Sequence, residues 1–155
     1  MKKVIWRYNQ IQDLKKITKD KRIVLVGGCF DILHYGHLVF LQKAKAEGDF
    51  LLVALESDQF IEDVKKRQSI HDQLQRAEII NALQIIDGVI MLPYFTTSEQ
   101  YMDLVTKLKP AVIAVSEGDT RLDNKKRQAV AVGATVKIVA PLLTEFSTTK
   151  IAAIL

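Results

Sequence analysis

The sequence predicts an α/β fold in which helices cover a doubly wound, parallel sheet of five strands. Short apolar runs alternate with amphipathic stretches of helical length along the 155 residues, a pattern typical of successive β-α-β units. One of these runs, residues 23–26, leads into Gly27 and Gly28 and then into an amphipathic stretch near Leu38. A strand, a glycine-containing turn and a helix start in this order predict the first unit of such a sheet.

The apolar runs predict the strands, and the stretches between them predict the helices. Gly48 and Gly133 are expected to end two of the helices, and Gly48 is expected in the left-handed conformation. Asp72, with Gln75 three positions later, predicts a capping box. The expected strands are 23–26, 50–55, 88–92, 111–115 and 135–139, and the expected helices are about 11–19, 36–47, 58–64, 72–83, 98–108, 124–132 and 147 onward.

Length and composition predict one domain that spans residues 1–155. An apolar fraction of 48% suffices for a packed core. The apolar runs are too short to cross a membrane, and the N-terminal stretch lacks the apolar core of a signal peptide. Cys29 is the single cysteine, so no intrachain disulfide is expected. We therefore expect a cytoplasmic protein without a membrane partner.

The charge balance favours small anionic ligands over nucleic acid. Basic residues number 22 and acidic residues 18, which leaves a formal net charge of +4. The lysines are scattered along expected surface helices, and the densest late run, Lys125-Lys126-Arg127, has no interleaved aromatic residues for base stacking. We expect phosphorylated small molecules as partners and no nucleic acid.

The stretch GGCFDILHYGH, residues 27–37, is the main candidate for chemistry. It lies at a strand end and helix start, where backbone N–H groups and the helix dipole favour phosphates. His34 and His37 are three residues apart across a turn that enters a helix, so both rings are expected to point into the same space. Neither a Walker motif nor GxGxxG is present, which argues against a P-loop enzyme and a dinucleotide site.

GCFDILHYGH resembles the signature of the nucleotidyltransferase superfamily, whose pattern includes GxFDxxHxGH. The chain is most similar to bacterial D-glycero-D-manno-heptose 1-phosphate adenylyltransferases, and next to glycerol-3-phosphate and ethanolamine-phosphate cytidylyltransferases. The resemblance implies a Rossmann-like nucleotidyltransferase fold and a homodimer. Further segments that match are Gly48-Asp49, Ser57-Asp58, Gln75-Arg76, Lys109-Pro110, Gly118-Asp119 and Ser147-Thr148-Thr149.

The resemblance also implies roles for individual residues. His34, His37 and Lys65 are the expected catalytic residues, and Asp31 and Arg76 are expected to bind the acceptor. Mg²⁺ is the expected cofactor, without direct protein ligands, and ATP or CTP and a phosphorylated small molecule are the expected substrates. The expected nucleotide-binding residues are Gly28, Cys29, Phe30, Gly36, Gly118, Asp119, Ser147, Thr148 and Thr149.

Several of these residues have alternative interpretations. Asp31 could orient the turn, bind Mg²⁺ through water or hold the acceptor. Arg76 could clamp a phosphate or pair with an acidic neighbour such as Asp72. Cys29 is better explained as a small packed residue than as a nucleophile, because direct transfer between phosphates needs no thiolate. The hydroxyls at Ser147 to Thr149 suit a helix cap as well as an anion site.

The acceptor part of the family pattern is altered. Gln68-Ser69 stands where relatives often have Arg-Pro, and Leu142 and Glu145 depart from the pattern before the Ser-Thr-Thr segment. The leading hypothesis is transfer of a nucleotide monophosphate to a sugar phosphate of the heptose 1-phosphate type. The alternatives are a cytidylyltransferase that acts on a phospho-alcohol and a non-catalytic nucleotide sensor.

Overall fold

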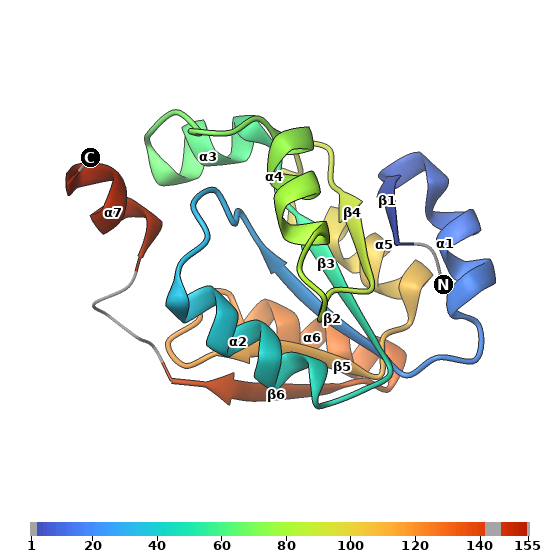
Figure 1. Cartoon of the computed structure of the whole chain (residues 1–155). Helices are drawn as coiled ribbons and strands as arrows, with labels where there is room; N and C mark the ends of the chain where they lie inside the picture. The colour runs from blue at the N-terminus through green and yellow to red at the C-terminus, as the bar shows by residue number, and fades with distance from the viewer. Residues whose placement is uncertain (1–2, 142–146, 155) are drawn as a thin grey trace.

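A computed structural model describes residues 3–141 and 147–154, and within them all six strands form one parallel sheet (Figure 1). The strand order is β1-β4-β3-β2-β5-β6. Every pairing between neighbouring strands is parallel. The strands are β1 (Val4–Arg7), β2 (Ile23–Gly28), β3 (Phe50–Leu55), β4 (Gly88–Met91), β5 (Val112–Ser116) and β6 (Thr135–Ala140).

The predicted number of five strands is wrong, because β1 adds a sixth strand at the edge of the sheet. This strand pairs with β4 alone among the described strands, from Val4 opposite Gly88 to Arg7 opposite Met91. Trp6 is its single buried residue. The apolar run in this edge strand, Val4-Ile5-Trp6, is only three residues long, and so short a run does not by itself indicate a strand. The other strands begin or end within about two residues of their expected bounds.

Helices cover both faces of the sheet, as expected for a doubly wound fold (Figure 1). α2 and α4 pack on one face through Leu41, Ala44, Ala77 and Ile80. α1, α5 and α6 pack on the other, where Leu14, Leu104 and Ala129 join the core. The helices are α1 (Ile11–Thr18), α2 (Tyr35–Lys45), α3 (Asp58–Lys65), α4 (Gln73–Asn81), α5 (Ser98–Leu108), α6 (Leu122–Val132) and α7 (Thr148–Ile154), with a 3₁₀ turn at Tyr8–Gln10.

The central strands are buried on both faces. β3 has six buried residues in succession, and alternate residues of β2 join opposite cores: Val24 and Val26 on one side, Leu25 on the other. Continuous apolar runs of this kind are typical of parallel strands covered by helices. No helix in residues 3–141 and 147–154 is long and apolar enough to cross a membrane.

The chain reverses its direction of winding between β2 and β5. β2 pairs with both β3 and β5. The helix after β2, α2, packs on one face of the sheet, whereas the helix after β5, α6, packs on the other. A parallel sheet opens a crevice at the carboxyl ends of the strands at such a switch point, and ligands bind there.

The two glycines expected at helix ends differ in conformation. Gly133 ends α6, as expected, and has a φ of 72°. Gly48 has no positive φ, so the explanation for that residue was wrong. It is instead packed tightly: a Cβ atom there would lie 2.5 Å from the carbonyl oxygen of Arg22 and 2.7 Å from Cγ2 of Val24. Gly48 therefore allows the chain to pass close to the start of β2.

Gly48→Ala is expected to lower the free energy of unfolding by about 1–3 kcal/mol, because backbone and a fully buried side chain must move to admit the methyl group. Gly27→Ala is the matched control, since the nearest atom to its Cβ would be 3.9 Å away. Urea unfolding of both variants checks the expectation. Equal stability losses at the two positions would contradict the packing explanation.

Candidate active site

A cavity of about 800 Å³ opens at the carboxyl ends of β2, β3 and β5, where the sheet reverses its winding. Gly28 lines it from the end of β2, Glu56 from the residue after β3, and Ser116 from the end of β5. The volume lies in the range of sites that bind small molecules and cofactors. The location is the one expected for this class of sheet.

Most of the residues predicted from the sequence meet at this cavity. The wall brings together three segments that are far apart in the chain, and Lys65 joins them from the end of α3. Asp31 and Arg76, the predicted acceptor residues, do not line it. The predicted residues that line it are Gly28, Cys29, Phe30, His34, Gly36, His37, Lys65, Gly118, Asp119, Ser147, Thr148 and Thr149.

The two histidines form a reciprocal cap at the start of α2. The backbone N–H of His37 donates to Nδ1 of His34 at 3.4 Å, and the backbone N–H of His34 donates to Nδ1 of His37 at 3.3 Å. The rings stack, with centroids 3.7 Å apart and an interplanar angle of 21°. Because each Nδ1 accepts a hydrogen bond, the proton of each neutral ring resides on Nε2. The local cap thereby sets the tautomer of both rings.

Burial favours the neutral form of both histidines in the free protein. Burial lowers the pKa of His37 from 6.5 to about 4; the charge of His34 adds to the shift, and a backbone hydrogen bond with Ile32 opposes it. Burial also lowers the pKa of His34. The pair therefore offers neutral N–H donors. A bound polyphosphate would favour the charged forms and raise both pKa values.

The depressed pKa of His37 makes the stability of the protein depend on pH. The unfolded state takes up a proton near pH 6.5, whereas the folded state takes it up near pH 4. The contribution to stability is therefore fully present above pH 6.5 and is lost as the pH falls towards 4; it amounts to at most roughly 3 kcal/mol. We expect His37→Asn to flatten the dependence of unfolding free energy on pH in this window. Urea titrations between pH 4 and 7.5 measure it, and identical slopes for both proteins would contradict it.

The loop after β2 turns at Phe30. Phe30 has a positive φ of 47°, and its buried ring lies against Gly28, where a Cβ would come within 2.7 Å of Cε2 of the ring. The Phe30 ring centroid is 5.0 Å from that of His37. The small residue at Gly28 thus admits the phenyl ring, which supports the imidazole of His37.

Asp31 holds the loop that follows α3. Its carboxylate accepts hydrogen bonds from Nη1 of Arg67 at 2.7 Å and from the backbone N–H groups of Ile70 and His71 at 2.9 and 3.0 Å. Burial opposes ionisation of Asp31, but the Arg67 hydrogen bond and the two N–H groups outweigh it and hold its pKa below the usual range. These are the contacts of a residue that orients the chain, which is one of the roles considered from the sequence; a role of Asp31 in binding the acceptor stays a prediction.

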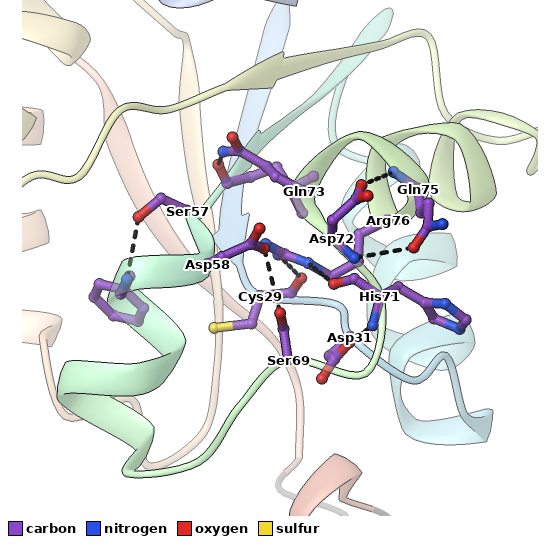
Figure 2. A network of polar contacts seen from close by, with 12 residues as sticks. Cys29, Asp31, Ser57, Asp58, Ser69, His71, Asp72, Gln73, Gln75 and Arg76 are labelled. Carbon is purple, nitrogen blue, oxygen red and sulfur yellow. Dashed lines mark hydrogen bonds and ion pairs between the residues drawn. The ribbon is translucent and has the colours of Figure 1, made fainter.

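Arg76 is fully buried and joins three segments around the active-site loop (Figure 2). Its guanidinium donates to the carbonyl oxygens of Cys29 at 2.7 Å and His71 at 3.1 Å and to Oδ1 of Asp58 at 2.7 Å. Asp58 is therefore its ion-pair partner. Asp72, the partner considered from the sequence, instead forms the predicted capping box with Gln75. A buried guanidinium needs hydrogen-bond acceptors and an opposite charge, and the two carbonyl oxygens and the carboxylate supply these at Arg76.

Sequence reasoning missed a second polar group in the cavity wall, formed by Glu56, Tyr101 and Arg121. The one available signal was the place of Glu56, a charged residue directly after a buried strand. Tyr101 and Arg121 lie in or beside helices, and no local pattern distinguishes them. Within residues 3–141 and 147–154, no cluster of three His, Cys, Asp or Glu side chains is placed to hold a metal.

A site of this kind suits an enzyme that acts on nucleotide phosphates, because it gathers hydrogen-bond donors where a parallel sheet binds phosphorylated ligands. The chain belongs to the cytidylyltransferase-like family, whose sequence profile matches residues 25–153. It is a nucleotidyltransferase, and the resemblance of its signature to the HxGH superfamily is confirmed.

The relatives fall into more than one group. An FAD synthase from Pyrococcus horikoshii is 36% identical over 122 residues, which cover 77% of this chain and 80% of that protein. The bifunctional protein HldE of Geobacter sulfurreducens is 38% identical over 126 residues, which cover 79% of this chain and 25% of that protein. This chain thus spans about a quarter of HldE.

Solved structures agree with the fold. A lipopolysaccharide core biosynthesis protein from Thermoplasma volcanium matches with a TM-score of 0.63 and 28% identity, covering 77% of this chain and 95% of that one. A pantoate-beta-alanine ligase from Francisella tularensis covers 96% of this chain and 76% of that one, with a TM-score of 0.66 and 15% identity. This second likeness concerns the fold alone.

Proposed function

We propose that the protein transfers AMP from ATP to the phosphate of a small phosphorylated acceptor, most directly a sugar phosphate of the heptose 1-phosphate type, and releases pyrophosphate. The observation that carries the proposal is the stacked pair of His34 and His37 at the start of α2, with both Nδ1 atoms engaged and both rings in the cavity wall. Fixed neutral donors at a helix N-terminus suit a group whose negative charge grows during reaction.

In this reaction an oxygen of the acceptor phosphate attacks the α-phosphorus in line. The new P–O bond forms while the bond from the α-phosphorus to the bridging oxygen of pyrophosphate breaks, so no covalent enzyme intermediate is needed. The protein then has two tasks, positioning the reactants and stabilising the negative charge. The Nε2–H groups of His34 and His37 would donate to the phosphates, and the ammonium of Lys65 would neutralise charge on the other wall of the cavity.

The nucleotide is proposed to lie between the start of α2 and the start of α7. Gly28, Cys29 and Phe30 lie beside the histidines, Gly118 and Asp119 follow β5, and Ser147 to Thr149 complete the wall. The hydroxyl of Thr148 donates to the carbonyl oxygen of Ile32 at 3.1 Å, so the start of α7 contacts the active-site loop directly. Side chains at the start of α2 and at the start of α7 could therefore contact the same phosphates.

Mg²⁺ fits this site as an ion carried by the triphosphate. Asp119 and Glu56 are carboxylates of the cavity wall, but Asp119 pairs with Lys125 at 2.6 Å and Glu56 accepts from Tyr101. Mg²⁺ commonly keeps several water ligands and binds substrate phosphates rather than an all-protein cage. The ion would offset phosphate charge, while the side chains hold the nucleotide in place.

ATP is favoured over CTP as the nucleotide, because FAD, the product in the name of the FAD synthase relatives, is flavin mononucleotide joined to AMP. The FAD synthase relatives also motivate a second acceptor, flavin mononucleotide, since one of them is matched over 80% of its length. A cytidylyltransferase that acts on glycerol 3-phosphate or ethanolamine phosphate is the remaining alternative. Leu142 and Glu145, which motivated the sensor hypothesis, lie outside the described residues, and family membership supports an enzyme instead.

Pyrophosphate release with Mg²⁺ tests the proposal. ATP and CTP are each combined with a panel of sugar 1-phosphates, flavin mononucleotide, glycerol 3-phosphate and ethanolamine phosphate. We expect the highest kcat/KM for ATP with a sugar phosphate. A higher kcat/KM with flavin mononucleotide would identify that compound as the acceptor instead, and a higher kcat/KM with CTP would identify CTP as the nucleotide. No pyrophosphate release with any combination would contradict the proposal.

A further inference from the structure

A buried carboxylate lines the cavity beside α5 and α6, on the opposite face of the sheet from α2. Glu56 directly follows β3 and is 6% exposed. Both of its carboxylate oxygens accept from the hydroxyl of Tyr101, at 3.0 and 2.9 Å. A carboxylate is costly to bury unless it is paired or has another use. Its place at the end of a fully apolar strand therefore calls for an explanation.

Glu56 has spare capacity to accept hydrogen bonds. Among the described residues, no Lys or Arg forms an ion pair with it. Arg121 donates to the hydroxyl of Tyr101 at 3.3 Å, and its guanidinium lies 4.7 Å from the centre of the Phe60 ring. The arginine thus holds the tyrosine and not the carboxylate. One hydroxyl donor leaves much of the acceptor capacity of two carboxylate oxygens unused.

The surroundings keep the carboxylate in place and partly offset the cost of its charge. Burial raises the pKa of Glu56, while the Tyr101 hydrogen bond and the positive charges of Arg121, Lys125 and Arg76 lower it. Aromatic side chains form the adjoining wall, with Phe60, Phe95 and Tyr101 all lining the cavity. Apolar wall segments that carry a few fixed polar groups are typical of a site that selects its ligand by orientation.

We propose that Glu56 determines acceptor specificity by accepting hydrogen bonds from hydroxyl groups of the acceptor, which selects a polyhydroxylated sugar phosphate. This inference rests on the proposed function, because it places a phosphorylated acceptor in the cavity. A sugar offers several O–H donors at close spacing and C–H faces that pack on aromatic rings. The flavin ring system offers mainly acceptors and a single N–H group, so in flavin mononucleotide only the hydroxyls of the ribityl chain could satisfy the carboxylate.

Three variants of the 155-residue chain test the assignment with ATP, Mg²⁺ and the best sugar phosphate of the panel. Glu56→Gln keeps the shape and removes the charge, and we expect the KM for the acceptor to rise tenfold or more while the KM for ATP stays within twofold. Tyr101→Phe keeps the ring but releases the carboxylate, and a smaller rise in acceptor KM is expected. Glu62→Gln, an exposed position on α3, is the matched control and should change neither value.

Deoxy analogues of the acceptor identify a direct contact. The effect of Glu56→Gln should disappear for the analogue that lacks the hydroxyl bound by Glu56. Unchanged acceptor KM in Glu56→Gln would overturn the proposal. So would equal rises in the KM values for ATP and acceptor together with a lower melting temperature, because those mark a structural role.

Failure of the proposed function has a different signature, since wild-type protein would then release no pyrophosphate with any acceptor. Calorimetric titration of the sugar phosphates into wild-type and Glu56→Gln protein still tests the inference in that case. Weaker binding by the variant supports it, and absent or equal binding overturns it.

Discussion

Replacing His37 with Asn is expected to lower kcat by about a hundredfold to a thousandfold, the usual effect of removing one fixed donor to a charged transition state. The side-chain oxygen of Asn can take the place of Nδ1 and accept the backbone N–H of His34, so the cap at the start of α2 is largely retained. What the variant lacks is Nε2. The KM for ATP should change by less than about threefold, because the donor acts mainly on charge that develops during reaction.

His71→Asn is the matched control for this experiment. The imidazole of His71 does not line the cavity and points away from the network that its backbone joins (Figure 2). Its kcat should remain within about twofold of wild type. A His37→Asn enzyme with unchanged kcat, or with a loss confined to the KM for ATP, would contradict a catalytic role for His37.

The second large effect is expected at Arg76, and it concerns stability. Arg76→Met should lower the free energy of unfolding by roughly 3–5 kcal/mol, since it removes the fully buried guanidinium that pairs with Asp58 and leaves the carbonyl oxygens of Cys29 and His71 without this donor. Lysine should not restore stability, because one ammonium cannot reproduce the planar, forked guanidinium contacts with three separate oxygens. Urea unfolding at pH 7 measures the loss.

Two further variants establish an order of effects. Asp58→Asn should cost about 1–2 kcal/mol, because the side chain of Asp58 is 45% exposed and the variant retains an oxygen for Arg76. Arg127→Met removes an exposed guanidinium that contacts Asn124 on the same helix, so a change below about 0.5 kcal/mol is expected. If Arg76→Met instead left stability intact and raised the KM for the acceptor, the original prediction that Arg76 binds the acceptor would be correct.

Local sequence determined the repeating units of the fold and the centre of the site. The strands from β2 to β6 and helix α5 were predicted because their apolar spacing reflects burial on one or both sides of the same segment. The histidine pair was predicted because a helix start brings residues i and i+3 together wherever it occurs. Interactions between near neighbours in the chain fix both kinds of feature.

Tertiary structure decided which distant residues meet. Asp31 could not be matched to Arg67 and the backbone of Ile70, nor Arg76 to Cys29, because no periodicity relates segments that far apart in the chain. The edge strand β1 is likewise identified by its pairing with β4, a segment far away in the chain, and not by its composition. Gly48 could be read as a helix terminus from sequence, yet the backbone of Arg22 is what requires a glycine there. The sequence by itself determined the nucleotidyltransferase signature with its two histidines. The fold decided which charges pack behind the loop that carries them and which carboxylate, that of Glu56, lines the cavity.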